Sequence, residues 1–313
     1  MRPRDRELAQ QLEARLLIFH REKYPLPGII APAIREILIE QFLESIHRVE
    51  YVLTIRTRNL SERSANPNDE IFDPLKAAIL HQRQGNFDEA YWLLFFFVHF
   101  GQHARAGWRY AREIYGCLGA SARWDWASTS SNPSGFKKWL HSHQDELKRE
   151  EVHGGFGNHR KYLSLDAYSS NGTGATVETY IKWVDPPRTH QELMERVCQQ
   201  AKGDPREAFD ILYHSMDSVR SFGRMARFDY LTMVGKLDLA RIEPGSAYLK
   251  NSTGPLNGAR LLFGGKKTAA LSATVLDGWL IELGADLKVG MQVVEDALCN
   301  WQKSPGELKR FRG

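Results

Sequence analysis

The sequence predicts an all-α protein, and three observations support this fold class. Apolar residues recur three and four positions apart over long stretches, for example through residues 34–55, and this is the period of an α-helix. Asp73 followed by Pro74 is typical of a helix start, with a capping carboxylate and a proline in the first turn. No stretch shows the alternating apolar and polar pattern of a half-buried strand.

The individual helices are predicted from the same period of apolar residues. Charges interrupt the apolar positions of residues 1–25, so this segment is predicted to be an amphipathic helix and not a signal peptide. Asn86 begins a helix that Gly101 ends, and its run AYWLLFFFVHF is too short to cross a bilayer, which indicates a core helix. Further helices are predicted over residues 105–118, 133–149, 160–168, 175–184, 189–201, 205–219, 222–237, 269–283 and 289–301.

The length of 313 residues allows one large domain or two modest ones. We expect one helical unit over residues 1–313, built as two lobes (about 1–153 and 154–313) that divide near the glycine-rich segment 154–157. A cleft between two lobes is a natural place for a site. The net charge of +4, from 42 Lys and Arg against 38 Asp and Glu, is mild and does not by itself require nucleic acid as a partner.

The sequence gives little indication of a metal site or of disulfide bonds. Cys117, Cys198 and Cys299 are odd in number and far apart, which argues against disulfides and a cysteine zinc site and favours a reducing, cytoplasmic setting. His99 and His103 have metal-ligand spacing, but Gly101 between them is expected to break the helix. We therefore expect no catalytic metal, no cofactor and no membrane partner, and no protein partner is indicated.

The segment SFGRMARFDYLTMVGKLDLARIEPGSAY, residues 221–248, begins with a turn between two predicted helices. Glycine in this turn lets the backbone bend tightly, and the amide groups at the start of the second helix suit a phosphate oxygen. An ordinary solvated face is the alternative interpretation of the basic residues. The candidate DNA-backbone contacts here are Gly223, Arg220, Arg224, Arg227 and Lys236.

This segment resembles the helix-hairpin-helix superfamily of DNA glycosylases. In that superfamily the hairpin grips the DNA backbone, and a catalytic aspartate follows about twenty residues after the last glycine of the hairpin. Glu243 stands at that distance from Gly223, although RIEPGSAY lacks the superfamily's Gly-Pro-Asp ending. Met225 stands where bifunctional members carry a lysine, so the resemblance implies a monofunctional enzyme without lyase chemistry.

A carboxylate at position 243 has a chemical rationale under this resemblance. Breaking an N-glycosidic bond leaves positive charge on the sugar, which a fixed carboxylate stabilises, and the same group can orient the attacking water. The alternative is that Glu243, which precedes a proline, is a loop residue or a cap. Asp229 is the second candidate acid, and an ion pair with Arg224, Arg227 or Lys236 is its alternative role.

Two further segments are candidates for contacting DNA. GGFGNHRKY, residues 154–162, combines glycines with basic and aromatic residues, as a loop that probes DNA for a flipped base would, or it is simply a helix entry. KNSTGPLNGAR, residues 250–260, suits a loop that approaches a phosphate closely, or a turn-rich connector. The candidate contacts are Asn158, His159, Arg160, Lys161, Ser252, Thr253, Asn257 and Arg260, and the candidate base-pocket or wedge residues are Phe156, His159, Tyr162, Gln82 and Tyr248.

Most of residues 30–265 also resembles one protein family. The runs FDPLKAAILHQRQGNFDEAYWLLFFFVHFG, GGFGNHRKYLSLDAY and IEPGSAYLKNSTGPLNGARLLF are similar to the alpha-glutamyl/putrescinyl thymine pyrophosphorylase proteins of clade 3. That resemblance implies hypermodified bases in phage DNA and a glycosylase-like fold. We therefore expect a DNA glycosylase that flips and excises a bulky modified pyrimidine, in antiviral defence. A transferase acting on hypermodified thymine and a non-catalytic binder of modified DNA are the alternatives.

Overall fold

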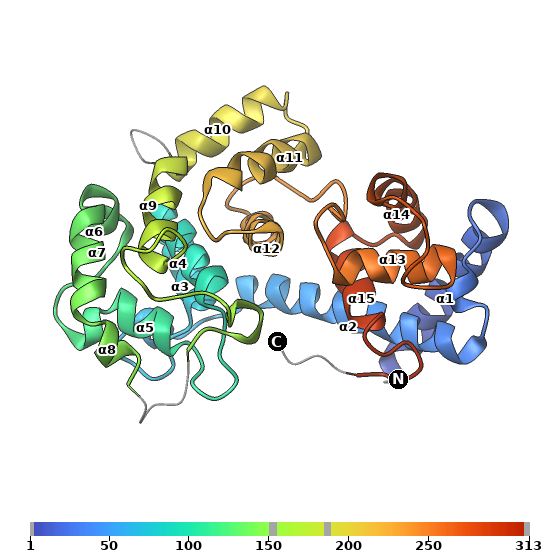
Figure 1. Cartoon of the computed structure of the whole chain (residues 1–313), viewed down its shortest axis with the longest axis horizontal. Coiled ribbons are helices and arrows are strands. Elements are labelled where there is room, and N and C mark those ends of the chain that lie inside the picture. The colour runs from blue at the N-terminus through green and yellow to red at the C-terminus, as the bar shows by residue number, and fades with distance from the viewer. Residues whose placement is uncertain (1–2, 150–154, 185–188, 310–313) are drawn as a thin grey trace. The chain divides into compact units, whose positions relative to one another are not determined.

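The computed structural model describes residues 3–149, 155–184 and 189–309. Over these residues the regular structure consists of α-helices, α1 to α15, with short 3-10 segments, and strand pairing is limited to isolated bridges (Figure 1). This confirms the predicted all-α class. The chain folds into two compact units: unit 1 contains residues 1–54 and 244–312, and unit 2 contains residues 55–243.

Unit 1 is assembled from both ends of the sequence. Its helices are α1 (Arg6–Glu22), most of α2 (Pro32–Thr57), α13 (Gly254–Gly264), α14 (Ala273–Leu287) and α15 (Met291–Trp301). Phe19, Phe42 and Trp301 are fully buried in its core. The Arg48 guanidinium on α2 donates two hydrogen bonds, of 2.8 and 2.6 Å, to the Asp296 carboxylate on α15, which ties these helices together.

Close packing of α13 against α15 depends on Gly258. A Cβ at this position would lie 2.4 Å from the backbone oxygen of Leu298. We expect Gly258→Ala to lower the free energy of unfolding in urea by about 1–3 kcal/mol, because the backbone must shift to admit the methyl group. Gly278→Ala on α14, where nothing lies within 4 Å, is the matched control and should leave stability unchanged or raise it by up to about 1 kcal/mol. Equal effects of the two substitutions would contradict this packing.

Unit 2 is organised around α4 (Phe87–Phe100). Its apolar run is buried as predicted, and α4 packs against α3, α5, α6, α10 and α12; Figure 1 shows α3 and α4 side by side. In the described part of the chain, the helices are all too short or too polar to traverse a bilayer. The other helices of unit 2 are α3 (Pro74–Arg83), α5 (Arg109–Tyr115), α6 (Trp126–Ser131), α7 (Pro133–Ser142), α8 (Gln144–Leu147), α9 (Thr173–Val184), α10 (His190–Gln200), α11 (Pro205–Ser215) and α12 (Arg224–Lys236).

Several predicted helices have different bounds in the structure. The helix predicted over 105–118 begins only at Arg109, because residues 103–107 form a turn closed by backbone hydrogen bonds between His103 and Gly107. The helix predicted over 133–149 is broken at His143 into α7 and α8. The helix predicted over 160–168 is absent apart from a 3-10 turn at Asn158–Arg160. The short helix α6 was not predicted.

The division into units differs from the predicted lobes. The predicted boundary at residues 153 and 154 lies outside the described residues, and the chain divides instead at residues 54 and 243. The physical reason is that the segment after residue 154 packs inside unit 2. The Gly157 amide donates a 2.7 Å hydrogen bond to the Phe100 carbonyl at the end of α4, and the Phe156 ring stacks on the Phe100 ring at 5.7 Å.

Candidate functional site

The helix pair predicted around the turn is present in unit 2. Helix α11 continues into a 3-10 turn at Met216–Ser218, and α12 begins after a short connection. The left-handed residue of this connection is Ser221, with φ of 56°, whereas Gly223 has φ of −68° and is the residue preceding the helix. The turn is fixed to its surroundings because the Ser221 hydroxyl donates to the Asn171 carbonyl at 2.9 Å and the Arg220 amide donates to the Thr179 hydroxyl at 2.9 Å.

The start of α12 is suited to an anion. It has no side-chain cap, Gly223 is exposed, and the helix dipole places partial positive charge there. Arg220 is exposed beside it, while the Arg224 guanidinium lies 5.2 Å from the centre of the Phe228 ring. Lys236 stands at the far end of the thirteen-residue helix, about 18 Å from its start, and so does not contribute to this cluster.

Arg227 lies inside unit 2 and not on the solvated surface that the sequence indicated. Its guanidinium pairs with the Asp217 carboxylate, donates to the Tyr213 carbonyl at 3.1 Å and lies 4.6 Å from the centre of the Tyr213 ring. The side chain is buried. Arg227 therefore holds α12 to the preceding helix and is not placed to contact a phosphate at the turn.

Glu243 is the last residue of unit 2, twenty positions after Gly223. Its amide donates to the Pro205 carbonyl at 3.2 Å, which places it beside the start of α11. Its carboxylate accepts a 2.9 Å hydrogen bond from the Arg206 guanidinium, and the two side chains are 55% and 63% exposed. The carboxylate is thus oriented by an arginine yet open to solvent, so that a substrate or a water molecule can reach it.

Asp229 has an ion-pair partner that the sequence did not indicate. Its carboxylate lies 2.9 Å from the Arg160 guanidinium, whereas the sequence suggested Arg224, Arg227 or Lys236 as the partner. Arg160 is buried and also donates to the Val98 carbonyl at 2.7 Å. Because Arg160 belongs to the segment 155–172, the ion pair fastens this segment to α12, and the hydrogen bond to the Val98 carbonyl fastens it to the end of α4. Arg160 is therefore an internal anchor, whereas it had been predicted as a DNA contact.

The other candidates in this segment divide into two groups. Phe156 is partly buried and packs against the rings of Phe100, Tyr110 and His99, at 5.4 to 5.7 Å, so these contacts would have to break before it could act as a wedge. Asn158, His159 and Lys161 are exposed, and Tyr162 has 89% of its surface exposed, the highest value among the large apolar and aromatic side chains that the structure describes.

The remaining candidates lie elsewhere. Gln82 donates its side-chain amide to the Leu237 carbonyl and so joins α3 to the end of α12. Tyr248, Ser252, Thr253, Asn257 and Arg260 belong to unit 1. The predicted loop 250–260 is largely helical, because α13 begins at Gly254 with a proline in its first turn. Arg260 donates to the Leu271 carbonyl at 3.2 Å.

The histidines with metal-ligand spacing do not converge. His99 is buried with its Nε2 3.0 Å from the Thr173 hydroxyl, and burial together with the nearby Arg160 lowers its pKa to about 3. His103 accepts hydrogen bonds from the backbone of its own turn. The described residues contain no cluster of three or more His, Cys, Asp or Glu side chains with the geometry to hold a metal ion.

A pocket of about 510 Å³ at the start of α4 was not identified from the sequence. Glu89 lies in it, and its carboxylate accepts hydrogen bonds of 2.7 Å from the Tyr115 hydroxyl and 2.8 Å from the Trp126 amide. Burial outweighs these hydrogen bonds and raises the pKa of Glu89 to about 7. Arg123 and Asp125 also line the pocket. A carboxyl group that titrates near neutrality is suited to proton transfer.

Asp88, the neighbour of Glu89, begins a buried chain of hydrogen bonds. Its carboxylate lies 2.7 Å from the Nδ1 of His190. The Nε2 of the same ring lies 2.7 Å from the Tyr180 hydroxyl. The Tyr180 hydroxyl in turn lies 2.7 Å from the Tyr230 hydroxyl. Burial lowers the pKa of His190, whose ring links the Asp88 carboxylate to the Tyr180 hydroxyl. Acids in the first turn of a helix ordinarily complement the dipole, so the sequence alone gave no signal of this arrangement.

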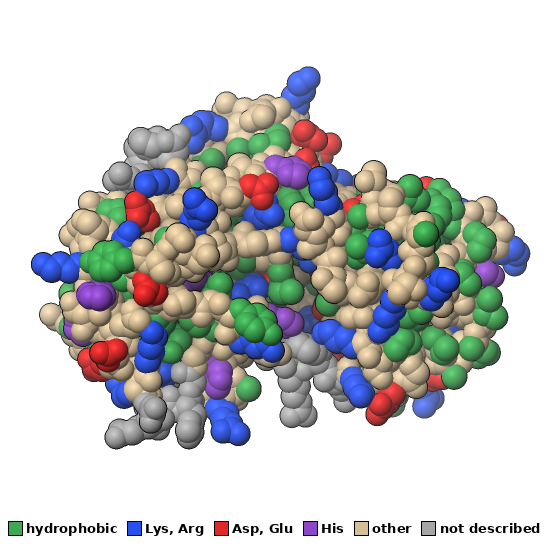
Figure 2. All heavy atoms as spheres, viewed as in Figure 1, with side chains coloured by type: hydrophobic (Ala, Val, Ile, Leu, Met, Phe, Trp, Pro, Cys, Tyr) green, Lys and Arg blue, Asp and Glu red, His purple; other side chains and the backbone are tan. Residues whose placement is uncertain are grey.

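The face in Figure 2 shows more Lys and Arg side chains than Asp and Glu, with acidic groups interspersed. Within unit 2 the structure thus contains an uncapped helix start with the exposed Arg220 beside it and a separate pocket lined in part by acidic residues. The chain belongs to the alpha-glutamyl/putrescinyl thymine pyrophosphorylase clade 3 family, whose model matches residues 33–313. The family is associated with modified thymine in DNA, and its name denotes an enzyme. No curated protein and no solved structure matches the chain.

Proposed function

We propose that the protein is a DNA N-glycosylase that excises a bulky modified pyrimidine and leaves an abasic site, in defence against phages that carry such bases. The observation that supports this most is the uncapped start of α12 followed, twenty residues later, by the solvent-accessible carboxylate of Glu243. The substrate class agrees with the family, which is associated with modified thymine in DNA.

In this proposal the start of α12, with Arg220 beside it, binds a phosphate of the DNA backbone. The target base leaves the stack, because an enzyme cannot reach the sugar–base bond within a duplex. The bond between C1′ and the base nitrogen breaks, the base leaves with the bonding electrons and a proton, and water adds to C1′. Glu243 stabilises the positive charge on the sugar and orients the water, while Asp229 is the reserve acid.

The family and the pocket at Glu89 favour one second candidate, a transferase. In this reaction an amine attacks a thymine whose modified group carries pyrophosphate; a carbon–nitrogen bond forms, the carbon–oxygen bond to pyrophosphate breaks, and the glycosidic bond stays intact. Glu89, with a pKa of about 7, would take the proton that the amine loses. The pocket of about 510 Å³ has room for a small amine.

One incubation separates these functions. Full-length protein is incubated with DNA carrying modified pyrimidines and with unmodified DNA, abasic sites are detected by alkali cleavage, and released bases are identified by mass spectrometry. Free modified base with alkali-labile strands is the expected result. Intact strands whose base has changed mass, together with free pyrophosphate, would establish the transferase instead. DNA binding with no product of either kind would establish a binding protein.

A further inference from the structure

The segment 161–171 presents two tyrosines to solvent, each with a lysine against its ring. Tyr162 is 89% exposed and the Lys161 ammonium lies 5.1 Å from the ring centre. Tyr168 is 58% exposed and the Lys137 ammonium of α7 lies 5.6 Å from its ring centre. An exposed aromatic residue is unremarkable alone. We call Tyr162 and Tyr168, which are six positions apart in the sequence, together with the lysines beside their rings, the tyrosine surface.

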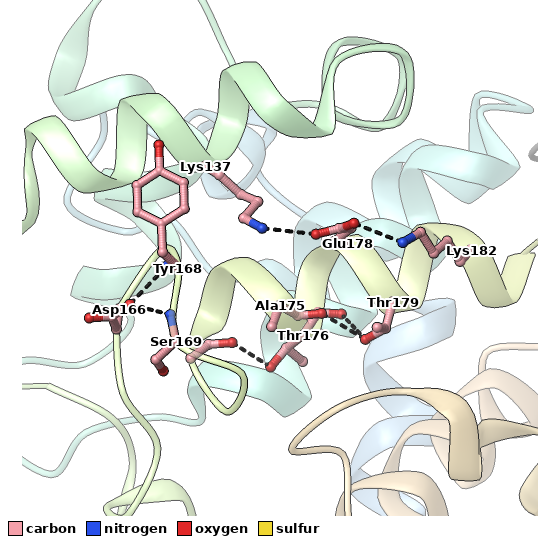
Figure 3. A network of polar contacts seen from close by, with 10 residues as sticks. Lys137, Asp166, Tyr168, Ser169, Ala175, Thr176, Glu178, Thr179 and Lys182 are labelled. Atoms are coloured by element: carbon pink, nitrogen blue, oxygen red, sulfur yellow. Dashed lines mark hydrogen bonds and ion pairs between the residues drawn. The ribbon is translucent and has the colours of Figure 1, made fainter.

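Both tyrosines are held on ordered backbone. Arg160, two residues before Tyr162, is buried and fixed to the Val98 carbonyl and the Asp229 carboxylate. Asp166, two residues before Tyr168, accepts hydrogen bonds from the Tyr168 amide at 2.7 Å and from the Ser169 amide at 2.6 Å (Figure 3). Because the backbone is fixed at both points, a ligand that binds the rings loses little conformational entropy from this segment.

Around the tyrosine surface the three lysines Lys137, Lys161 and Lys182 stand against the two acids Glu178 and Asp166. Figure 3 shows Glu178 between Lys137 and Lys182. The Glu178 carboxylate accepts hydrogen bonds of 2.9 Å from the Lys137 ammonium and 2.8 Å from the Lys182 ammonium, and these two lysines lower the pKa of Glu178 to about 2. Asp166 is engaged by backbone amides, so neither acid is an unpartnered negative charge. The hydrogen bond from the Arg220 amide to the Thr179 hydroxyl joins α9, which carries Lys182, to the turn before α12.

Exposed aromatic rings beside cations favour a single-stranded nucleic acid over a duplex. A base in a duplex is covered on both faces by its neighbours, whereas a base in a single strand can stack on a side chain while lysines bind the flanking phosphates. We propose that the tyrosine surface binds single-stranded DNA, with bases stacked on Tyr162 and Tyr168 and phosphates held by Lys161, Lys137 and Lys182. This deepens the proposed function and rests on DNA being the substrate.

The test measures binding of a fluorescent oligothymidylate of about twelve nucleotides, a length within known single-strand site sizes, to the full-length protein. A blunt duplex of the same length is the comparison. We expect the single strand to bind more tightly, and Tyr162→Ala and Tyr168→Ala each to weaken it by roughly 5- to 150-fold. Tyr162→Phe and Tyr168→Phe should retain most of the affinity because they keep the ring. Tyr51→Ala, at a 57% exposed tyrosine of unit 1, is the control and should bind as the parent does.

Two results would overturn the inference: a duplex bound as tightly as the single strand, or alanine variants that bind the single strand like the parent. Either result would leave the glycosylase proposal intact if modified base is still released. Conversely, single-strand binding that depends on both rings, without release of any base, would support the tyrosine surface and contradict the excision. A lysine variant gives an independent measure, since Lys161→Gln should reduce the slope of log affinity against log salt by about 0.7 if it removes one phosphate contact.

Discussion

Glu243→Gln is expected to lower the rate of base release from modified DNA by about 10²- to 10⁴-fold, while DNA affinity stays within about 2-fold of the parent. The neutral amide keeps the size of the side chain but neither stabilises a sugar cation nor accepts a proton from water. The substitution should not unfold the protein, because the ion pair that it breaks is 55% and 63% exposed, and exposed pairs contribute at most about 1 kcal/mol. Single-turnover release of the modified base, measured by mass spectrometry, checks the rate.

Three control variants make this result specific. Arg206→Gln removes the partner of Glu243 but keeps the carboxylate, so it should have a much smaller effect on base release than Glu243→Gln. Glu207→Gln changes a neighbouring exposed acid on α11 and should leave release unchanged. Asp229→Asn tests the reserve acid. Full activity in Glu243→Gln combined with inactive Asp229→Asn would transfer the catalytic role to Asp229, and full activity in both would contradict the proposed chemistry.

Local sequence patterns were sufficient for most of the helices, but not for all of their bounds and not for their packing partners. Asp73, Pro74 and Gly101 were identified as helix ends because capping and chain reversal depend on the residue itself. The predicted loop at 250–260 was wrong from Gly254 onward, since its glycine at position 258 serves close contact with α15 and not a turn. Glycine has both uses, and only the position of the neighbouring helix distinguishes them.

Local sequence patterns also did not predict which side chains of the candidate site contact one another. The spacing of Glu243 after Gly223 could be counted in the sequence, and the structure places both in unit 2. The partners Asp229–Arg160 and Asp88–His190 are 69 and 102 positions apart, so no local pattern could pair them. Burial is likewise a property of the whole fold. It turned Arg160 and Arg227 into internal anchors and raised the pKa of Glu89, although each was an ordinary charged residue in the sequence.

The second prediction with a large effect concerns how the free energy of unfolding depends on pH, and it follows from the raised pKa of Glu89. Its pKa is about 7 in the folded protein against an ordinary value of 4.5, so the folded state binds this proton more tightly than the unfolded state. The contribution of Glu89 to stability is therefore fully present below about pH 4.5 and is lost as the pH rises to about 7. The loss amounts to about 3 kcal/mol, because each unit of pKa difference corresponds to about 1.4 kcal/mol.

Glu89→Gln isolates this contribution, because an amide resembles the protonated acid at every pH. In urea unfolding at pH 5, 6, 7 and 8, the free energy of unfolding of the variant minus that of the parent should rise by about 1.4 kcal/mol per pH unit up to pH 7 and then level off. The difference also cancels the contributions of His99 and His190, whose lowered pKa values favour the folded state as the pH rises. Tyr115→Phe removes one donor to the carboxylate and should extend the loss to higher pH. Parallel stability profiles of Glu89→Gln and the parent would show that Glu89 is ionised throughout this range, and would remove the basis for assigning it the proton transfer in the transferase reaction.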